Sequence, residues 1–352
     1  MVDRLLATAT LSKPVEAAFR SVPRDLFLPG VDLERVYSGD VIVTRSDDRG
    51  RPISSSSQIG IMAPMLEHLA VSAGMRVLEV GAGTGYNAAL LDELVGPDGS
   101  VTTIEIDPTT AEEARVHLAG SGHRRVHVID GDGWSGVPEA APVDRIVLAA
   151  STADLSPAWV EQLRDGGILV APVVLRANGA QAVVAFRKHG LVLESERVVV
   201  GGFMPLRGHG APAESTETVG KLRISAAGSA DLAAIARLLA EPPRLALDDF
   251  DWSKEWLLAI VAEGTISVSR VDQPITRGIA TADGVALIQW TRGAVAGPQA
   301  LLLSYGSGSA LELLCALMAK LRDRSFDDVR VRAVPAGPDA SSRTYVFEVT
   351  LQ

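Results

Sequence analysis

The stretch VLEVGAGTGYNAALL, residues 77–91, decides the fold of this chain. An apolar run typical of a buried strand leads into the loop Gly81-Ala82-Gly83-Thr84-Gly85, and a helical pattern follows. Glycines let a backbone turn tightly and approach a ligand without Cβ clashes. Free N–H groups at the start of the next helix favour carboxylate or hydroxyl oxygens. The stretch therefore predicts a strand–loop–helix unit whose loop binds a small ligand.

The alternation of strand and helix patterns continues beyond this unit. The sequence predicts helices at 86–95 and 108–119, and strands at 75–81, 100–107, 125–132, 144–150 and 167–174. Strands that alternate with helices at this spacing predict a parallel sheet covered on both faces. The order βαβαβ is that of a nucleotide-binding half.

The spacing of the glycines and two acidic residues discriminates between cofactors. A dinucleotide fold prefers glycine or alanine at position 86, where tyrosine stands, and the Gly-Lys-Ser/Thr of a P-loop is absent. Glu105, at the end of the second strand, could accept both hydroxyls of a ribose. Asp132, in Gly131-Asp132-Gly133 after the third strand, could accept an adenine amino proton. Each acid alone could equally be an ordinary turn residue; the ordered set favours a nucleoside cofactor.

The first 70 residues are predicted to be helical at both ends and irregular between. Ser12 is expected to cap a helix that begins at Lys13-Pro14, with proline at a tolerated first-turn position. Residues 44–57 are polar and rich in helix and strand breakers, so they predict a loop. A helix is predicted over 62–69.

The C-terminal part has a different pattern. Residues 207–219 lack large apolar side chains apart from a valine near their end and predict a domain boundary. Beyond it, 216–352 predicts a smaller α+β domain, with Asp283-Gly284 as a hairpin turn. Its predicted helices are 230–240 and 308–322, and its strands are 264–270, 276–281, 285–290, 299–304, 328–334 and 344–350.

Composition narrows the class of protein. The 352 residues suggest two domains, and 47% hydrophobic with 22% charged residues is an ordinary globular balance. The net charge of −10 argues against a broad nucleic-acid surface. A single cysteine, Cys315, excludes an intrachain disulfide, and the six histidines show no H-x-x-x-H pair suited to a metal, since His123 and His127 lead into a predicted strand and not a helix. Without a signal-like or bilayer-spanning apolar stretch, we expect a soluble, cytoplasmic protein with no membrane partner.

With the motifs placed, residues 15–206 resemble the protein-L-isoaspartate O-methyltransferase family, and Glu79-x-Gly81-x-Gly83-x-Gly85 resembles motif I of class I methyltransferases. The resemblance implies a doubly wound, Rossmann-like class I methyltransferase sheet over 1–210, carrying the helical segment 1–70. The matching segments, in order, are VPRDLF (22–27), Tyr37, Ser57-Gln58, MLEHL (65–69), VLEVGAGTGY (77–86), IEID (104–107), GDGWSG (131–136), APVDRI (141–146), EQLRDGGILVAPV (161–173), Gln181 and FMPL (203–206).

The resemblance also implies the cofactor, S-adenosyl-L-methionine (SAM), with S-adenosyl-L-homocysteine as its product and no metal. The positions that correspond to the cofactor contacts of the family are Glu79, Gly81, Gly83, Gly85, Tyr86, Glu105, Ile106, Asp132 and Gly133.

The reaction implied is methyl transfer to an aspartyl or isoaspartyl carboxylate of a peptide or protein. In the family, the serine of a Ser-Gln/Ala-Pro turn contacts the substrate carboxylate, and Ser57 is the matching residue. The chain departs from that pattern at Ile59, which replaces the proline, and four serines precede Gln58. The expected substrate residues are Ser57, Gln58, Ile59, Met204 and Pro205.

The added C-terminal domain leaves several functions open. Family members with such a domain resemble enzymes that tailor ribosomally made peptide natural products, in which a methylated aspartate loses methanol to give an aspartimide and then isoaspartate. Repair-type members carry extensions too. An RNA or small-molecule methyltransferase and a binding module without catalysis also stay open. Trp252 and Trp256 share a helical face and are expected in the core rather than in a peptide-binding surface. Residues 304–314 predict a turn with a serine helix cap.

Overall fold

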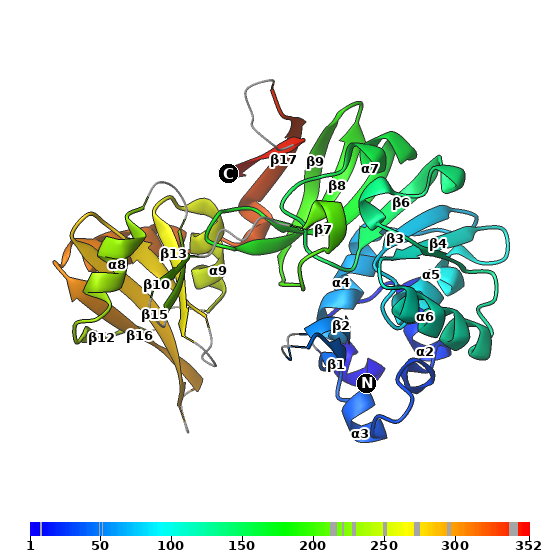
Figure 1. Ribbon diagram of the computed structural model, residues 1–352, viewed down its shortest axis with the longest axis horizontal. Helices are drawn as coiled ribbons and strands as arrows, with labels where there is room; N and C mark the ends of the chain where they lie inside the picture. The colour runs from blue at the N-terminus through cyan, green and yellow to red at the C-terminus, as the bar shows by residue number, and fades with distance from the viewer. Residues whose placement is uncertain are drawn as a thin grey trace.

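The computed structural model contains two large sheets, one in each half of the molecule (Figure 1). Among the residues that it describes, no helix is long and apolar enough to cross a membrane. The described residues are 1–7, 9–48, 50, 52–211, 217–219, 222–226, 230–248, 252–270, 275–293, 297–337 and 344–352.

The first sheet has nine strands in the order β18-β17-β9-β8-β7-β6-β3-β4-β5. Strands β5, β4, β3, β6 and β7 run parallel, and every neighbour pair from β7 to β18 is antiparallel. The bounds are β3 Arg76–Val80, β4 Ser100–Glu105, β5 His127–Asp130, β6 Val143–Leu148, β7 Leu163–Val174, β8 Gln181–His189, β9 Val192–Val200, β17 Val329–Pro335 and β18 Tyr345–Leu351. The predicted strands of the parallel half are therefore confirmed, whereas β8 and β9 had no counterpart in the prediction.

Both faces of this sheet are buried because side chains alternate along each strand. Val77 of β3 packs into one apolar core, and its neighbour Leu78 packs into the other. The first core contains α2 Lys13–Ser21, α4 Ile59–Leu69 and α5 Tyr86–Val95, and the second contains α7 Pro157–Gln162. The doubly wound arrangement is confirmed.

Helix α6 Pro108–Gly120 shows how local chemistry starts an element at the right residue. Proline occupies its first position, where no N–H partner is needed. The Asp107 side chain caps the helix by accepting a hydrogen bond of 2.9 Å from the Thr110 backbone N–H. The short N-terminal elements are α1 Val2–Leu6, η1 Arg24–Phe27 and α3 Leu33–Val36.

The second sheet has seven antiparallel strands in the order β10-β11-β13-β14-β15-β16-β12. Together with three helices it confirms the smaller α+β unit, and Asp283-Gly284 lies in the β14–β15 turn. The bounds are β10 Glu217–Val219, β11 Leu222–Ala226, β12 Arg244–Asp248, β13 Thr265–Arg270, β14 Thr276–Ala280, β15 Gly284–Gly293, β16 Gly297–Gly306, α8 Leu232–Leu238, α9 Trp252–Val261 and α10 Ser309–Leu321.

The last two strands correct the predicted range of the second domain, 216–352. Strand β17 pairs with β9, with Ala333 opposite Leu193, so β17 and β18 extend the first sheet instead of closing the second. The second unit is thus an insertion between β9 and β17, and the range 216–352 is not one continuous domain. Apolar and charged residues alternate at the start of β17, and the structure buries the apolar ones, as in a half-buried strand. That pattern carries no information on which sheet edge the strand joins.

Residues 44–57, predicted as a loop, instead contain most of a β-hairpin. Strand β1 Ile42–Ser46 pairs with β2 Pro52–Ser56, with Ile42 opposite Ser56. The polar composition favoured a loop in the prediction. In the structure, polar side chains of the two strands bond across the hairpin, with Thr44 Oγ1 3.0 Å from Ser54 Oγ.

Of the two predicted serine caps, that of Ser12 is wrong, and the first N–H of α10 is bound by the Ser307 hydroxyl, at 3.3 Å, and not by the residue directly before the helix. Ser12 occupies the position before α2, but its hydroxyl donates to Glu67, 3.0 Å away, and makes no cap hydrogen bond. Helix α10 follows Gly308, and the Ser309 hydroxyl bonds Asp283 at 2.8 Å. In both cases the hydroxyl donates its hydrogen to a carboxylate.

The two units share an apolar core and a polar junction. The apolar cluster on one face of the first sheet extends to Leu257 and Leu258 of α9. At the junction the Asn178 amide donates to the Ala259 carbonyl at 3.0 Å and to the Thr265 hydroxyl at 2.7 Å. The inserted unit is therefore packed against the first sheet.

Of Trp252 and Trp256, both expected in the core, the structure describes the side chain of Trp256. Trp256 of α9 is half-buried, and the Arg277 guanidinium lies 3.9 Å from its ring centroid. It is neither a fully buried core residue nor a free surface aromatic. The side chain of Trp252 lies outside the described residues.

Candidate active site

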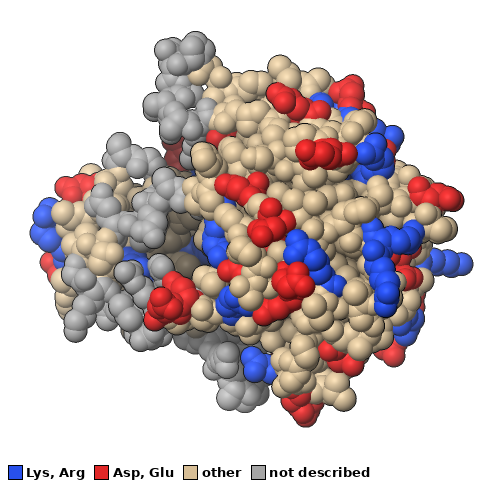
Figure 2. Space-filling model, turned by 45° about the vertical axis from the view of Figure 1, so that its right-hand side comes forward, with Lys and Arg blue, Asp and Glu red and all other residues tan. Residues whose placement is uncertain are grey.

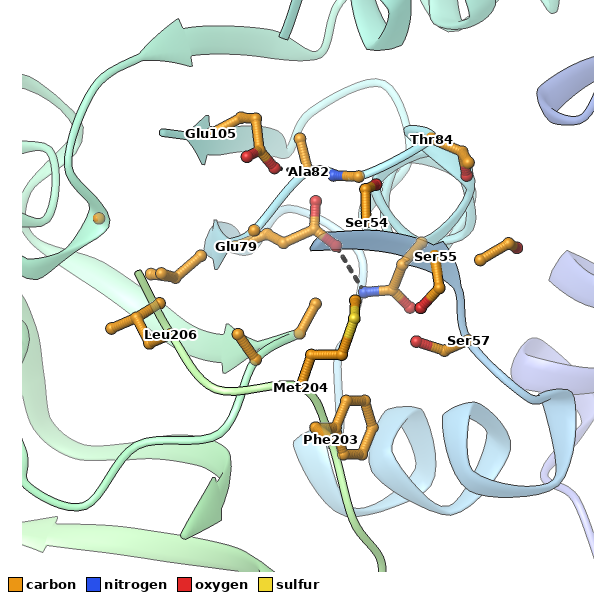
Figure 3. Close-up of a pocket in the computed structure, with 18 of the residues that line it drawn as sticks. Ser54, Ser55, Ser57, Glu79, Ala82, Thr84, Glu105, Phe203, Met204 and Leu206 are labelled. Atoms are coloured by element: carbon orange, nitrogen blue, oxygen red, sulfur yellow. Dashed lines mark hydrogen bonds between the residues drawn. The ribbon is translucent and has the colours of Figure 1, made fainter. Parts of the chain in front are cut away.

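A cavity of about 300 Å³ opens at the carboxyl ends of the parallel strands (Figure 3). This is the edge where ligands bind in open α/β sheets. Its walls are the loops after β3, β4 and β6, the β2 strand with the serine segment 54–57, and the segment 202–207. The predicted site residues that line it are Ser57, Gln58, Glu79, Gly81, Gly83, Tyr86, Glu105, Ile106, Gly133, Met204 and Pro205.

The three glycines of the loop after β3 all have positive φ angles, of 96°, 51° and 87°. Gly81 and Gly83 line the cavity, and a Cβ on Gly83 would lie 3.6 Å from the Ser55 carbonyl oxygen. Gly85 does not line it. A Cβ there would lie 3.2 Å from Leu118 of α6, so this glycine allows α5 and α6 to pack closely.

Glu79 is a fully buried carboxylate in the wall of the cavity (Figure 3). It accepts hydrogen bonds from the Asn87 amide at 2.8 Å and from the Thr103 hydroxyl at 2.6 Å. Burial raises the pKa of Glu79 to about 7, and the two hydrogen bonds only partly oppose that rise. The side chain can therefore carry either charge state near neutral pH.

Glu105 ends β4 and faces the glycine loop. Its carboxylate accepts from the Gly83 N–H at 3.1 Å and from the Asp107 N–H at 3.2 Å. Arg207 lies 3.4 Å from the same carboxylate. The group is thus held by backbone donors at the place where a ribose could bind.

Asp132 stands behind the cavity and does not line it. Its carboxylate accepts from the N–H of Trp134 and the N–H of His209, each at 2.9 Å. A Cβ on Gly208 would come within 2.5 Å of the same carboxylate. The turn η4 Gly208–Gly210 therefore packs directly on the residue expected to bind an adenine.

The serine segment forms the opposite wall. In Figure 3 the Ser57 side chain faces the cavity, and among the described residues its hydroxyl has no hydrogen-bond partner. Gln58 precedes α4, and Ile59 begins that helix. Ile59 is 2% exposed, belongs to the apolar core and does not line the cavity. The isoleucine that replaces the family proline therefore alters the packing of the turn against the core and not the lining of the cavity.

The segment 203–206 is held in place by a side chain of β8 and by the backbone that follows β6. Gln181 accepts from the Phe203 N–H at 2.9 Å, and the Ser151 N–H donates to the Met204 carbonyl at 2.8 Å. Met204 and Phe203 then face the serine segment across the cavity (Figure 3).

The structure adds residues that the sequence interpretation assigned no role. Asn87 holds Glu79, Arg207 pairs with Glu105, and Arg24 donates to the Ser57 carbonyl at 3.0 Å. Arg24 lies in the segment VPRDLF and Asn87 in the glycine-loop stretch 77–91. Their place in these two segments could have marked them as site residues, but the sequence does not show which groups they bind.

The lining suits a SAM-like ligand. Glycines at 81 and 83 leave backbone space, and a carboxylate at 105 with backbone donors provides a polar anchor beside it. The charged residues of the lining are Glu79, Glu105 and Arg207. Within the described ranges, no group of three or more His, Cys, Asp or Glu side chains could hold a metal.

Comparisons with known proteins identify the family. A family model described as protein-L-isoaspartate(D-aspartate) O-methyltransferase matches residues 1–210. A protein-L-isoaspartate O-methyltransferase of Methanococcus maripaludis strain C7 is 37% identical over 210 residues, covering 59% of this chain and 94% of that protein. The enzyme of the same name from Ignicoccus hospitalis is 41% identical over 177 residues, covering 49% and 80%.

Two solved structures share the fold. A protein-L-isoaspartate O-methyltransferase superposes with a TM-score of 0.58 at 24% identity and covers 100% of both chains. A structure described as that enzyme from Plasmodium falciparum, in complex with S-adenosyl-L-homocysteine, has a TM-score of 0.51 at 16% identity and covers 58% of this chain and 96% of that one. The chain belongs to the protein-L-isoaspartate O-methyltransferase family and is a SAM-dependent methyltransferase.

Proposed function

We propose that this enzyme methylates an aspartyl or isoaspartyl carboxylate of a peptide or protein, with Ser57 orienting the acceptor oxygen. The observation that carries the proposal is the contact between two loops: the Ser55 carbonyl lies 3.6 Å from the Cβ position of Gly83. An acceptor at the serine segment and a cofactor at the glycine loop would therefore be neighbours. Methyl transfer depends above all on such positioning.

The chemistry needs little from the protein beyond orientation and exclusion of water. A carboxylate is already a nucleophile, so no strong general base is required. A sulfonium cofactor supplies the activated methyl group. The acceptor oxygen forms the new O–CH3 bond as the S–CH3 bond breaks, giving a methyl ester and a neutral thioether. In this scheme the Ser57 hydroxyl donates a hydrogen bond to the carboxylate and so orients the oxygen that accepts the methyl group.

The proposed cofactor contacts are the family positions that line the cavity, together with Asp132 behind it. The loop at Gly81 and Gly83, with Glu105 beside it, is proposed to hold the ribose and amino-acid parts. Glu79, Tyr86, Ile106 and Gly133 line the same region and complete the proposed binding surface. Asp132 is proposed to accept the adenine amino proton, which requires η4 to release its carboxylate.

For the substrate, we favour a ribosomally made, modified peptide whose methylated aspartate closes to an aspartimide and opens to isoaspartate. The inserted unit supports this version because it reaches the cavity rim. A Cβ on Gly202, a lining residue, would lie 4.0 Å from the Trp256 ring of α9. An extended peptide leaving the cavity past Gly202 would meet the inserted unit. The alternative is general repair of isoaspartyl proteins.

The acidic site disfavours an RNA substrate. Among the described residues of the lining, the basic side chain is that of Arg207, which is paired with Glu105. On the face drawn in Figure 2, acidic and basic side chains are interspersed. Nucleic-acid affinity depends on unpaired cations that displace counterions.

The test is methylation of two peptides that differ only in carrying aspartate or isoaspartate at one position. Mass spectrometry follows the added methyl group and any later loss of methanol. Methylation of the isoaspartyl peptide alone supports repair, and methylation of neither, with intact SAM binding, supports a dedicated partner peptide. Methylation of an RNA in preference to any peptide would overturn the proposal.

A further inference from the structure

Arg24 is a completely buried arginine that ties the serine segment to the N-terminal part of the chain. It belongs to η1, and its side chain is 0% exposed. Its Nη1 donates to the Val36 carbonyl at 3.0 Å, and its Nη2 donates to the Asp40 carbonyl at 3.1 Å. The same Nη2 donates to the Ser56 hydroxyl at 3.2 Å and to the Ser57 carbonyl at 3.0 Å. One guanidinium thus fixes both residues at the end of the serine segment.

Within the described chain no direct ion pair neutralises the charge of Arg24, although the Asp40 carboxylate attracts it from a longer distance. Among the described residues, no carboxylate oxygen lies within 4.0 Å of it, and its Nε has no hydrogen-bond partner. Burial lowers the pKa of Arg24 below its usual value, yet a guanidinium remains protonated in proteins. Burying an unpaired charge is costly. A buried cation behind the serine segment would favour a carboxylate bound at that segment.

We propose that Arg24 is a positioning residue for the acceptor: it fixes Ser57 through backbone and hydroxyl hydrogen bonds, and its charge favours a carboxylate at Ser57. Arg24 does not line the cavity, so it acts through the serine segment. The proposal rests on the role of Ser57 proposed above.

Arg145 offers a matched control. It is also buried, at 7% exposure, and it also donates to backbone carbonyls, those of Leu69, Ala70 and Asp144. Within the described part of the chain it has no carboxylate within 4.0 Å. None of these residues lines the cavity. A loss caused merely by disturbing a buried guanidinium should therefore be equal for both arginines.

The experiment compares Arg24→Lys, Arg145→Lys, Ser57→Ala and the double variant Arg24→Lys/Ser57→Ala in the full chain. With the isoaspartyl or aspartyl peptide that the wild type methylates, Arg24→Lys should lower kcat/KM about tenfold, mostly through KM. Arg145→Lys should stay within about twofold, and SAM affinity should be unchanged in all four. In the Ser57→Ala background, Arg24→Lys should cost less than about threefold, because the residue it positions is gone.

A second measurement does not depend on the substrate. Hydrogen exchange of backbone amides 55–59 should be faster in Arg24→Lys than in the wild type, with amides 81–85 unchanged. Ser56→Ala, which removes one Arg24 acceptor and leaves the charge, should show the same change more weakly.

Each outcome is decisive for one of the two proposals. Equal losses for Arg24→Lys and Arg145→Lys, or the same loss with and without Ser57, would overturn the role of Arg24. Unchanged exchange at 55–59 would do so as well. A wild type that methylates no peptide would instead overturn the proposed function, and the exchange measurement would still decide whether Arg24 holds the segment.

Discussion

The two large sheets differ in strand direction, and the candidate active site is built on the first of them. In the first sheet, β3, β4 and β6 run parallel, so their carboxyl ends meet at one edge. In the second sheet all neighbours are antiparallel, and consecutive strands end at opposite edges. Within the described chain, every residue lining the 300 Å³ cavity comes from 41–207. Strand direction thus determines which sheet can gather loops around a ligand.

The inserted sheet contributes in another way, by packing. Leu257 and Leu258 of α9 join the core of the first sheet, and Trp256 lies beside the rim residue Gly202. The comparison therefore predicts large effects on chemistry from residues of the parallel edge, and moderate effects on stability from the junction.

The largest effect is expected for Ser57→Ala. Removing the one hydroxyl proposed to orient the acceptor should lower kcat/KM about 100- to 1,000-fold, as for the loss of an oxyanion donor. SAM affinity, measured by calorimetry, should not change. Ser38→Ala, which removes a surface hydroxyl bonded to the Arg35 carbonyl, is the control. A loss in kcat/KM below about tenfold would mean that the serine segment encloses the cavity without orienting the acceptor.

Glu79→Gln should change how stability depends on pH. The folded pKa of about 7 lies above the ordinary value of 4.5, so the folded protein holds this proton more tightly than the unfolded chain. Stability contributed by the protonated form is therefore lost as pH rises through about 7. The variant stays neutral, so relative to it the wild type should lose up to about 3 kcal/mol between pH 5 and pH 8. Urea unfolding across this range measures the difference, and parallel curves for both proteins would refute the assignment.

Glu105→Gln should weaken SAM binding about 10- to 30-fold, because one charged acceptor beside the Gly83 N–H becomes neutral. The matched control is Glu112→Gln on α6, whose carboxylate is 67% exposed and pairs with Arg115. Titration calorimetry gives both dissociation constants. Equal constants for wild type and Glu105→Gln would place the ribose elsewhere.

The smallest of the four effects is expected at the junction. Asn178→Ala leaves the Ala259 carbonyl and the Thr265 hydroxyl without their donor. The free energy of unfolding should fall by about 1–2 kcal/mol while SAM affinity is retained. Thermal unfolding with and without S-adenosyl-L-homocysteine separates the two. A parallel loss of affinity would show that the inserted unit supports the cavity directly.

The sequence predicted the features that depend on residues near one another in the chain, and it missed those that depend on residues far apart in it. The loop at Gly81 and the strands around it were predictable because their signals are local. The pairing of β17 with β9 was not, since an alternating strand fits many sheet edges. Ile59 was expected to contact substrate, but its side chain enters the core when α4 begins. Arg24 bonds mostly to backbone carbonyls, which leave no pattern in a sequence.

The return of β17 and β18 to the first sheet affects how the protein can be made. Until residues 329–351 leave the ribosome, β9 presents an open edge with unpaired N–H and C=O groups. Such an edge is a template for pairing with another chain. Because domains usually fold from the N-terminus during synthesis, the catalytic half must wait through the whole inserted unit before its sheet is closed. Chains that stop near residue 210 should therefore aggregate more readily than the full protein.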